Sequence, residues 1–261
     1  MKISQKFKDL HKLGKKAFLA YVPFGFPTLD DSAKIILALQ DCGVDIVELG
    51  VPFSDPLADG PIIQAAANKA LAQGANTDKL FTMLNSLKGK LKIPLVIMTY
   101  YNPVLKYGMD KFFLKMKKAQ VSGVMIVDLP VEESKAYIKK ANRFNLETIF
   151  FVTPTTSFTR AKKIADHSKG FIYYISVTGI TGPQKLDGDW LAASVKRIRK
   201  VTQLPICVGF GIHKKSQVKE ISEFSDGVII GSEIVKFIDE NSCRKDLVKR
   251  LSKHIRSLCI K

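Results

Sequence analysis

The chain has 261 residues, of which 46% are hydrophobic, enough to bury the core of one large α/β domain or two small ones. No apolar run approaches the roughly 18 residues of a membrane span, the N-terminus lacks the apolar segment of a signal peptide, and the cysteines form no CxxC pair, so we expect a cytoplasmic protein without membrane contact. The net charge of +17 would suit nucleic acid, but the basic residues are spread over helical segments without an aromatic-interleaved stripe, so we expect solvated helix faces and no nucleic-acid partner.

Short apolar segments alternate with amphipathic segments along the whole chain. After a first helix at 3–12, strands are expected at 17–22, 45–50, 94–100, 123–129, 147–152, 171–176, 205–210 and 227–231. Helices are expected between and after them, at 31–42, 61–73, 77–89, 110–119, 132–143, 158–168, 190–201, 213–223, 233–239 and 244–259. Nearly continuous apolar strands of this kind are typical of parallel sheets that are buried on both faces.

This alternation predicts an α/β protein with a single (β/α)8 TIM barrel over residues 1–261. An extra N-terminal helix should precede the barrel, and a short helix after the eighth strand should form a phosphate site. No linker or shift in composition divides the chain. The alternative is an open doubly wound sheet, but its GxGxxG fingerprint after the first strand is absent.

The segment ELGVPFSDPLADGP, residues 48–61, is the most informative part of the chain, and it begins with an acid at the end of a strand. Because side chains alternate along a strand, Ile46 and Glu48 should face the barrel interior, and Val47 and Leu49 should face the helices. Active groups of such barrels lie at the carboxyl ends of the strands. Burial near apolar walls should raise the pKa of Glu48 and suit it to proton exchange near neutral pH, unless it is a structural acid paired with a lysine or with backbone N–H groups.

Three further acids have both a functional and a structural interpretation. Asp59 ends the same connection, where it could take part in acid/base chemistry or equally cap the helix that begins at Pro61. Asp55 fits a turn or a contact surface, and Asp128 favours capping or bracing a loop over orienting a catalytic group. The barrel rim that holds Glu48 should also hold Tyr100, Asp128 and Tyr173.

Glycine-rich segments follow the last three strands. They are SVTGITGP at 176–183, GFG at 209–211 and GSE at 231–233, the last of which opens a short helix. Glycines let backbone N–H groups approach an anion, and a helix N-terminus adds a favourable dipole, so these segments predict a phosphate site. Turns without a ligand are the alternative. Residues 176–190 are typical of a mobile lid, in which Thr181 could hydrogen-bond an active-site carboxylate.

The histidines show neither metal-ligand nor triad spacing, and no motif marks a lysine as a Schiff-base nucleophile. The sequence therefore favours acid/base chemistry with no metal and no covalent intermediate.

Together these motifs resemble the tryptophan synthase alpha subunit family over nearly the whole chain. Residues 48–61 match most strongly, and YYNPV, VDLPVEES, YYISVTGITG, VGFGI and GSEIV follow in the family's order and spacing. The resemblance implies a lyase of tryptophan biosynthesis that cleaves indole-3-glycerol phosphate to indole and D-glyceraldehyde 3-phosphate. It implies no cofactor in this chain and a pyridoxal-phosphate beta subunit as partner, in an α2β2 assembly that passes indole through a tunnel. A stand-alone indole-3-glycerol-phosphate lyase and a non-catalytic binding or regulatory subunit remain as alternatives.

The resemblance also implies roles for single residues. Glu48 matches the catalytic glutamate, which moves protons and places one on the indole C3, and Asp59 matches the aspartate that binds the indole N–H in the indolenine tautomer. That tautomer is the electron sink, so no Schiff-base lysine is required. Pro52 and Asp55 lie in the loop 52–60, which matches the segment that meets the beta subunit. The implied substrate-binding residues are Tyr173, Tyr21, Tyr100, Thr181, Gly182, Phe210, Gly211, Gly231 and Ser232.

Overall fold

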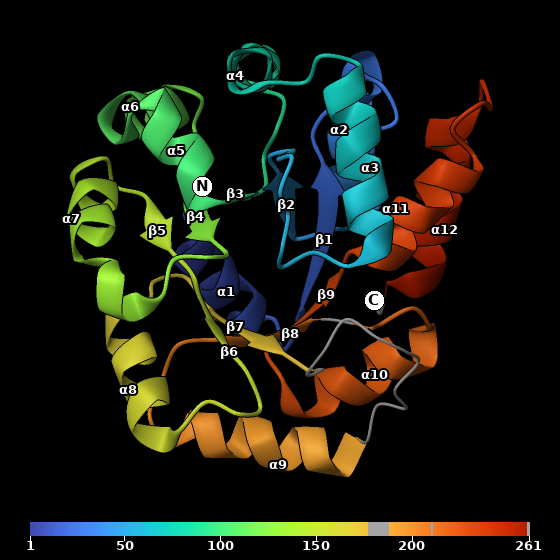
Figure 1. Ribbon diagram of the computed structural model, residues 1–261. Coiled ribbons are helices and arrows are strands. Elements are labelled where there is room, and N and C mark those ends of the chain that lie inside the picture. Colours follow the sequence, from blue (N-terminus) through green and yellow to red (C-terminus); the bar gives the residue numbers. More distant parts are fainter. Residues whose placement is uncertain (177–187, 210, 260–261) are drawn as a thin grey trace.

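The computed structural model describes residues 1–176, 188–209 and 211–259, and over these residues nine parallel strands form one sheet (Figure 1). The strands are neighbours in the order β5-β4-β3-β2-β1-β9-β8-β7-β6. Their bounds are β1 (Ala17–Pro23), β2 (Ile46–Gly50), β3 (Leu95–Thr99), β4 (Gly123–Ile126), β5 (Glu147–Thr148), β6 (Phe150–Val152), β7 (Ile172–Ile175), β8 (Ile206–Gly209) and β9 (Gly227–Ile230).

The sheet closes into a barrel through a single residue. β5 and β6 are the two ends of the strand order, yet only Ile149 separates them in the chain. The Ile149 N–H donates to the carbonyl oxygen of Val124 in β4 at 3.1 Å, and its side chain packs inside the barrel. The expected eight-stranded barrel is therefore confirmed, with its fifth strand interrupted at one position.

The helices lie around the outside of this barrel, except α1, which lies across one of its ends, as Figure 1 shows. They are α1 (Ile3–Lys12), α2 (Leu29–Asp41), α3 (Pro61–Ala72), α4 (Thr77–Ser86), α5 (Tyr101–Tyr107), α6 (Met109–Lys118), the 3-10 helix η1 (Val131–Glu133), α7 (Lys135–Arg143), α8 (Phe158–His167), α9 (Gly188–Arg199), α10 (Lys215–Phe224), α11 (Ser232–Glu240) and α12 (Leu247–Leu258). Within the described parts of the chain, no helix is long and apolar enough to cross a membrane.

Helix α5 was not expected from the sequence, and it contains Pro103. Pro103 lies in the first turn of α5, where its missing N–H needs no intrahelical partner. The carboxylate of Asp128 accepts the N–H of Tyr101, the first residue of the helix, at 2.7 Å. Asp128 therefore braces the start of α5.

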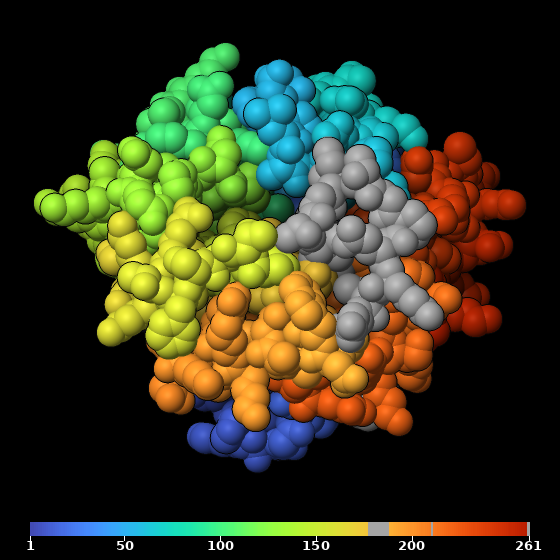
Figure 2. All heavy atoms as spheres, turned by 60° about the horizontal axis from the view of Figure 1, so that its bottom comes forward, coloured from blue at the N-terminus to red at the C-terminus, as the bar shows by residue number. Residues whose placement is uncertain are grey.

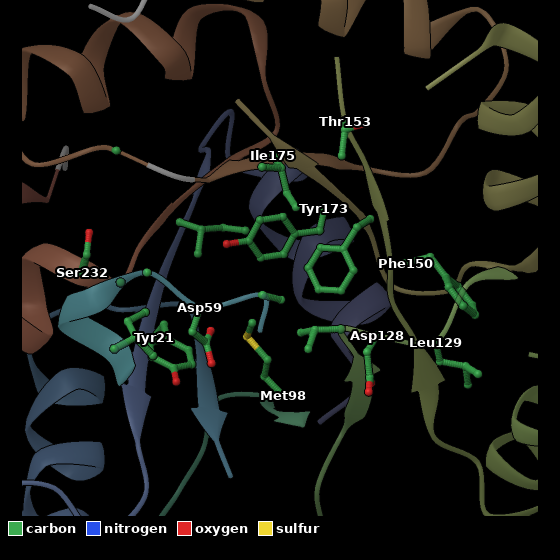
Figure 3. Close-up of a pocket in the computed structure, with 18 of the residues that line it drawn as sticks. Tyr21, Asp59, Met98, Asp128, Leu129, Phe150, Thr153, Tyr173, Ile175 and Ser232 are labelled. Atoms are coloured by element: carbon green, nitrogen blue, oxygen red, sulfur yellow. The ribbon is translucent and has the colours of Figure 1, made fainter. Parts of the chain in front are cut away.

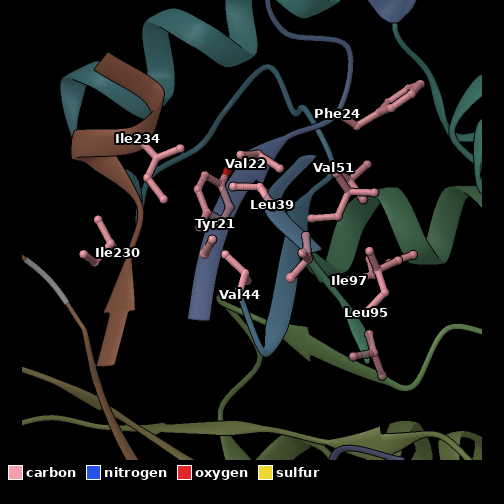
Figure 4. Packing of buried hydrophobic residues seen from close by; sticks show 14 of the residues in the cluster. Tyr21, Val22, Phe24, Leu39, Val44, Val51, Leu95, Ile97, Ile230 and Ile234 are labelled. Carbon is pink, nitrogen blue, oxygen red and sulfur yellow. The ribbon is translucent and has the colours of Figure 1, made fainter. Parts of the chain in front are cut away.

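Two hydrophobic clusters flank the strands, one inside the barrel and one between the barrel and the helices. Ile46 belongs to the interior cluster, whereas Val47 and Leu49 belong to the outer one, so the alternation expected along β2 is confirmed. Figure 4 shows part of the outer cluster, in which residues of β1, such as Val22, lie among side chains from the helices.

Helix α1 closes the end of the barrel where the strands begin. Its buried residues Ile3, Phe7 and Leu10 belong to the interior cluster. The helix has no side-chain cap of its own, and Glu147 at the start of β5 accepts the N–H groups of Ile3 at 2.6 Å and Ser4 at 3.2 Å. Helix α1 does not cover the opposite end of the barrel, where the strands finish.

Candidate active site

A cavity of about 730 Å³ opens at the carboxyl ends of the strands. Figure 3 shows that its walls come from segments far apart in the chain, with Tyr21 and Asp59 on one side and Phe150 and Leu129 on the other. The space-filling view in Figure 2 is hollowed near the meeting of blue, green and yellow segments. A site at this end of the barrel agrees with the general rule for the fold.

Glu48 is fully buried, and neither of its carboxylate oxygens has a hydrogen-bond partner in the described parts of the chain. Burial raises the pKa of Glu48 to about 8, so the carboxyl group is mainly protonated at neutral pH. It does not line the cavity itself. It pairs in register with Tyr21, which lines the cavity as Tyr173 does, and after burial its charge helps to raise the pKa of both hydroxyl groups. Within the described residues, Glu48 is therefore not a structural acid that is paired with a lysine or with backbone N–H groups.

Asp59 lines the cavity and is oriented by a tyrosine. The hydroxyl group of Tyr100 donates to Asp59 Oδ2 at 3.0 Å and accepts the N–H of Ala58 at 3.0 Å. Burial raises the pKa of Asp59 to about 6, although the hydrogen bond from Tyr100 opposes the shift, so the carboxylate is mainly ionised at pH 7. The residue before α3 is Gly60, with no side-chain cap, so the capping interpretation of Asp59 is wrong.

Two tyrosines lie across glycines of the neighbouring strands. A Cβ atom built on Gly50 of β2 would be 2.2 Å from the hydroxyl oxygen of Tyr21 in β1. In the same way, a Cβ atom on Gly209 of β8 would be 2.6 Å from the hydroxyl oxygen of Tyr173 in β7. Each glycine therefore leaves the space that a tyrosine ring occupies at the strand ends. The sequence reasoning missed this role of Gly50 and Gly209. Both positions face the barrel interior, because each lies two residues after an inward-facing residue, Glu48 or Cys207.

The other side of the cavity is suited to an anion. Gly211, Gly231 and Ser232 all line it, and α11 begins at Ser232. The first N–H groups of a helix have no intrahelical acceptor, so they are available to a ligand, and the helix dipole favours negative charge there. Gly211 has a φ of +74°, a left-handed conformation that favours glycine. The expected residues Thr181, Gly182 and Phe210, and most of the expected lid, lie outside the described residues.

The remaining wall of the cavity is apolar. Met98 at the end of β3, Ile175 of β7 and Ile229 of β9 line it together with the aromatic rings. The sequence reasoning did not name these three residues. The strand alternation that placed Glu48 inward also places them inward, so the signal was present. Among the residues that the structure describes, no group of three or more histidine, cysteine or acidic side chains is placed to hold a metal ion.

The comparisons with known proteins identify the family. A family model described as "Tryptophan synthase alpha chain" matches residues 7–258. This chain belongs to the tryptophan synthase alpha chain family. It is similar to the tryptophan synthase alpha chain of Petrotoga mobilis, with 42% identity over 98% of each chain. The alpha chain of Methanocaldococcus jannaschii is 43% identical over 94% of this chain and 89% of its own length.

Solved structures of the family have the same fold. Tryptophan synthase subunit alpha from Legionella pneumophila gives a TM-score of 0.91 at 31% identity, over 98% of this chain and 96% of that one. Tryptophan synthase from M. tuberculosis, in an aminoacrylate-bound form, gives 0.87 at 29% identity, over 98% of this chain and 97% of that one. The family and barrel expected from the sequence are confirmed, and the family is one of lyases in tryptophan biosynthesis.

Proposed function

We propose that this chain cleaves indole-3-glycerol phosphate to indole and D-glyceraldehyde 3-phosphate, using Glu48 and Asp59 as its catalytic residues. The observation that carries the proposal is the pair of buried acids with different proton affinities beside one cavity. The pKa of Glu48 is about 8 and that of Asp59 about 6, so near pH 7 one holds a proton and the other is charged. Two acids with separated pKa values can divide the work of acid and base.

The substrate has three parts, and each has a place in the cavity. The phosphate binds at the start of α11 and to the backbone at Gly211, Gly231 and Ser232, with Thr181, Gly182 and Phe210 also assigned to substrate binding. The indole ring lies against the apolar and aromatic wall that includes Met98 and Tyr173, so that the glycerol chain spans the distance between the two.

Asp59 and Glu48 then act in turn. The carboxylate of Asp59 accepts the indole N–H and stabilises the positive charge that the ring gains on protonation. Glu48 turns into the cavity and donates its proton to the indole C3. The Glu48 carboxylate then takes the proton of the adjacent hydroxyl group, the C–C bond breaks into the ring, and an aldehyde and indole leave. The ring itself is the electron sink, so the step requires no cofactor in this chain.

We propose that the chain acts in the cytoplasm with a pyridoxal-phosphate beta subunit, in an α2β2 assembly. The loop 52–60 is the proposed contact, because Asp55 and Leu57 are exposed and Pro52 is half-buried. Leu57 is 89% exposed, an unusual position for a large apolar side chain in a free surface loop. Indole release measured with and without a beta subunit tests this partner. Equal rates would favour a stand-alone lyase.

The variant Glu48→Gln tests the reaction itself. Gln keeps the shape of the side chain but neither donates nor recovers the proton, so we expect indole release to fall by about 10²-fold or more while substrate binding is retained. Glu133→Gln, at an exposed position of η1, is the matched control and should keep full activity. Near-normal turnover by Glu48→Gln would contradict the assigned role, and a wild-type chain without lyase activity would favour a binding or regulatory subunit.

A further inference from the structure

The hydroxyl group of Tyr21 has no hydrogen-bond partner in the described ranges, although the residue is mostly buried and lines the cavity. Tyr21 is 7% exposed and lines the cavity, and its hydroxyl group forms no hydrogen bond with any residue in the described ranges. The hydroxyl group of Tyr100, nearby, both donates and accepts. A hydroxyl group at a cavity wall with no protein partner is free to bind a ligand, so the group at Tyr21 indicates a position for a polar atom of that ligand.

The side chain of Tyr21 spans the space between the anion end of the cavity and the two acids. At its base, a Cβ atom on Gly231 would be 3.4 Å from the Tyr21 Cβ, so Tyr21 starts beside the residue that precedes α11. At its tip, the hydroxyl oxygen lies over Gly50, two residues beyond Glu48 in β2. The register of β1 and β2 places Tyr21 directly opposite Glu48. In Figure 3, Tyr21 lies between Ser232 and Asp59.

Burial and the neighbouring groups keep the hydroxyl group of Tyr21 a donor. Burial is the largest cause that raises its pKa, and Asp59 of the connection after β2, Tyr100 after β3 and Glu48 of β2 raise it further, while Tyr173 of β7 faces the same space. The hydroxyl group therefore keeps its proton throughout the pH range in which the acids titrate.

We propose that the Tyr21 hydroxyl group binds a hydroxyl group of the substrate's glycerol chain, between the phosphate and the indole ring. This inference rests on the proposed function. Of the polar groups of the substrate, the phosphate belongs to the start of α11, the indole N–H to Asp59 and the hydroxyl group beside the ring to Glu48. The other hydroxyl group of the glycerol chain is left without a partner. The glycerol chain must cross the same interval as the Tyr21 side chain, from Gly231 to the acids. Tyr21 then makes the site selective for a hydroxylated three-carbon chain over a deoxy chain of the same length.

The test combines Tyr21→Phe, which removes only the hydroxyl group, with two ligands. They are indole-3-glycerol phosphate and indole-3-propanol phosphate, which lacks both glycerol hydroxyl groups. For Tyr21→Phe we expect kcat/KM for indole-3-glycerol phosphate to fall about tenfold, the size of one lost hydrogen bond, with the Kd of indole-3-propanol phosphate unchanged within about twofold. Tyr174→Phe is the matched control, because Tyr174 is a buried tyrosine of β7 in the outer cluster, and it should change neither value.

Two results would overturn the inference while leaving the proposed function intact. Equal losses for both ligands would mean that Tyr21 only shapes the cavity, and no loss for indole-3-glycerol phosphate would mean that the hydroxyl group binds nothing in the substrate. A wild-type chain that neither cleaves indole-3-glycerol phosphate nor binds indole-3-propanol phosphate would instead overturn the proposed function, and the inference with it.

Discussion

Burial raises the pKa of both acids of the site, and its extent and one hydrogen bond make the two values differ. Glu48 has no partner in the described chain, so desolvation alone raises its pKa to about 8. Asp59 is also desolvated, but the hydroxyl group of Tyr100 stabilises its charged form and limits the pKa to about 6. The less complete burial of Asp59 and its hydrogen bond from Tyr100 together keep the two carboxyl groups in different protonation states near pH 7.

These pKa values predict a bell-shaped dependence of kcat/KM on pH. Activity should rise through about pH 6 as Asp59 ionises, reach a maximum near pH 7, and fall above about pH 8 as Glu48 loses its proton. The measurement is kcat/KM for indole-3-glycerol phosphate across this range. Tyr100→Phe removes the hydrogen bond to Asp59, so it should move the acid limb to higher pH. A rate that is flat between about pH 6 and 9 would contradict these assignments.

Glu48 should also make the free energy of unfolding depend on pH. Its pKa is raised from 4.5 to about 8 in the folded chain, so the folded state holds the proton more tightly. The stabilisation from this proton is complete below about pH 4.5 and is lost as the pH rises through about 8, a change on the order of 5 kcal/mol. Urea unfolding at about pH 5, 7 and 9 measures it. Glu48→Gln should flatten the profile, and a constant difference between the two proteins would contradict the prediction.

At the scale of elements, neighbouring strands are matched so that a large residue on one meets a glycine on the next. Tyr21 of β1 crosses Gly50 of β2, and Tyr173 of β7 crosses Gly209 of β8. Parallel strands place these pairs at the same end of the barrel. The rings therefore lie flat over the strand ends and form part of the cavity wall, and their hydroxyl groups are near Glu48.

Gly50→Ala tests this arrangement. The added Cβ would be 2.2 Å from the Tyr21 hydroxyl oxygen and 2.7 Å from Cζ, so the ring must leave its position. We expect kcat/KM to fall at least as much as in Tyr21→Phe, with a cost in stability of about 1–3 kcal/mol for overpacking. Gly60→Ala is the control, because a Cβ there meets no atom within 4 Å. Unchanged activity in Gly50→Ala would show that the position of the ring does not matter.

At the scale of the whole molecule, one end of the barrel is closed and the other carries the site. Helix α1 fills the closed end, and its first N–H groups are bound by Glu147, which is 144 residues from Ile3 in the chain. The end of the barrel where the strands begin thus contributes to stability, and the end where they finish carries the site, as is general for this fold. That residues 1–261 form a single domain stays a prediction.

Glu147→Ala should lower stability without impairing the chemistry. It leaves the N–H groups of Ile3 and Ser4 without their acceptor, which we expect to cost about 1–3 kcal/mol in the free energy of unfolding. The kcat at 25 °C should stay near the wild-type value, because the site is at the other end of the barrel. Denaturant unfolding and a steady-state assay measure the two effects, and an unchanged unfolding free energy would contradict the capping role.

The sequence by itself determined the order of strands and helices and the direction of Glu48. Both depend on the pattern of apolar residues within a short segment. That pattern is local because each strand or helix buries particular faces. The family motifs also marked Asp59 and the glycines around α11, and their roles in the reaction stay predictions. Helix α5 and the break at Ile149 were missed because their causes are contacts with other segments, Asp128 for the helix and β4 for the strand.

Only the tertiary structure decided which groups lack partners and which meet. In the described parts of the chain, Glu48 has no hydrogen-bond partner, and Tyr100 orients Asp59. Tyr21 lies over Gly50, and Glu147 caps α1. All four are relations between separate segments of the chain. Proton affinity and cavity shape follow from these relations, because desolvation and hydrogen bonding depend on every neighbour of a side chain in space, and local sequence does not specify those neighbours.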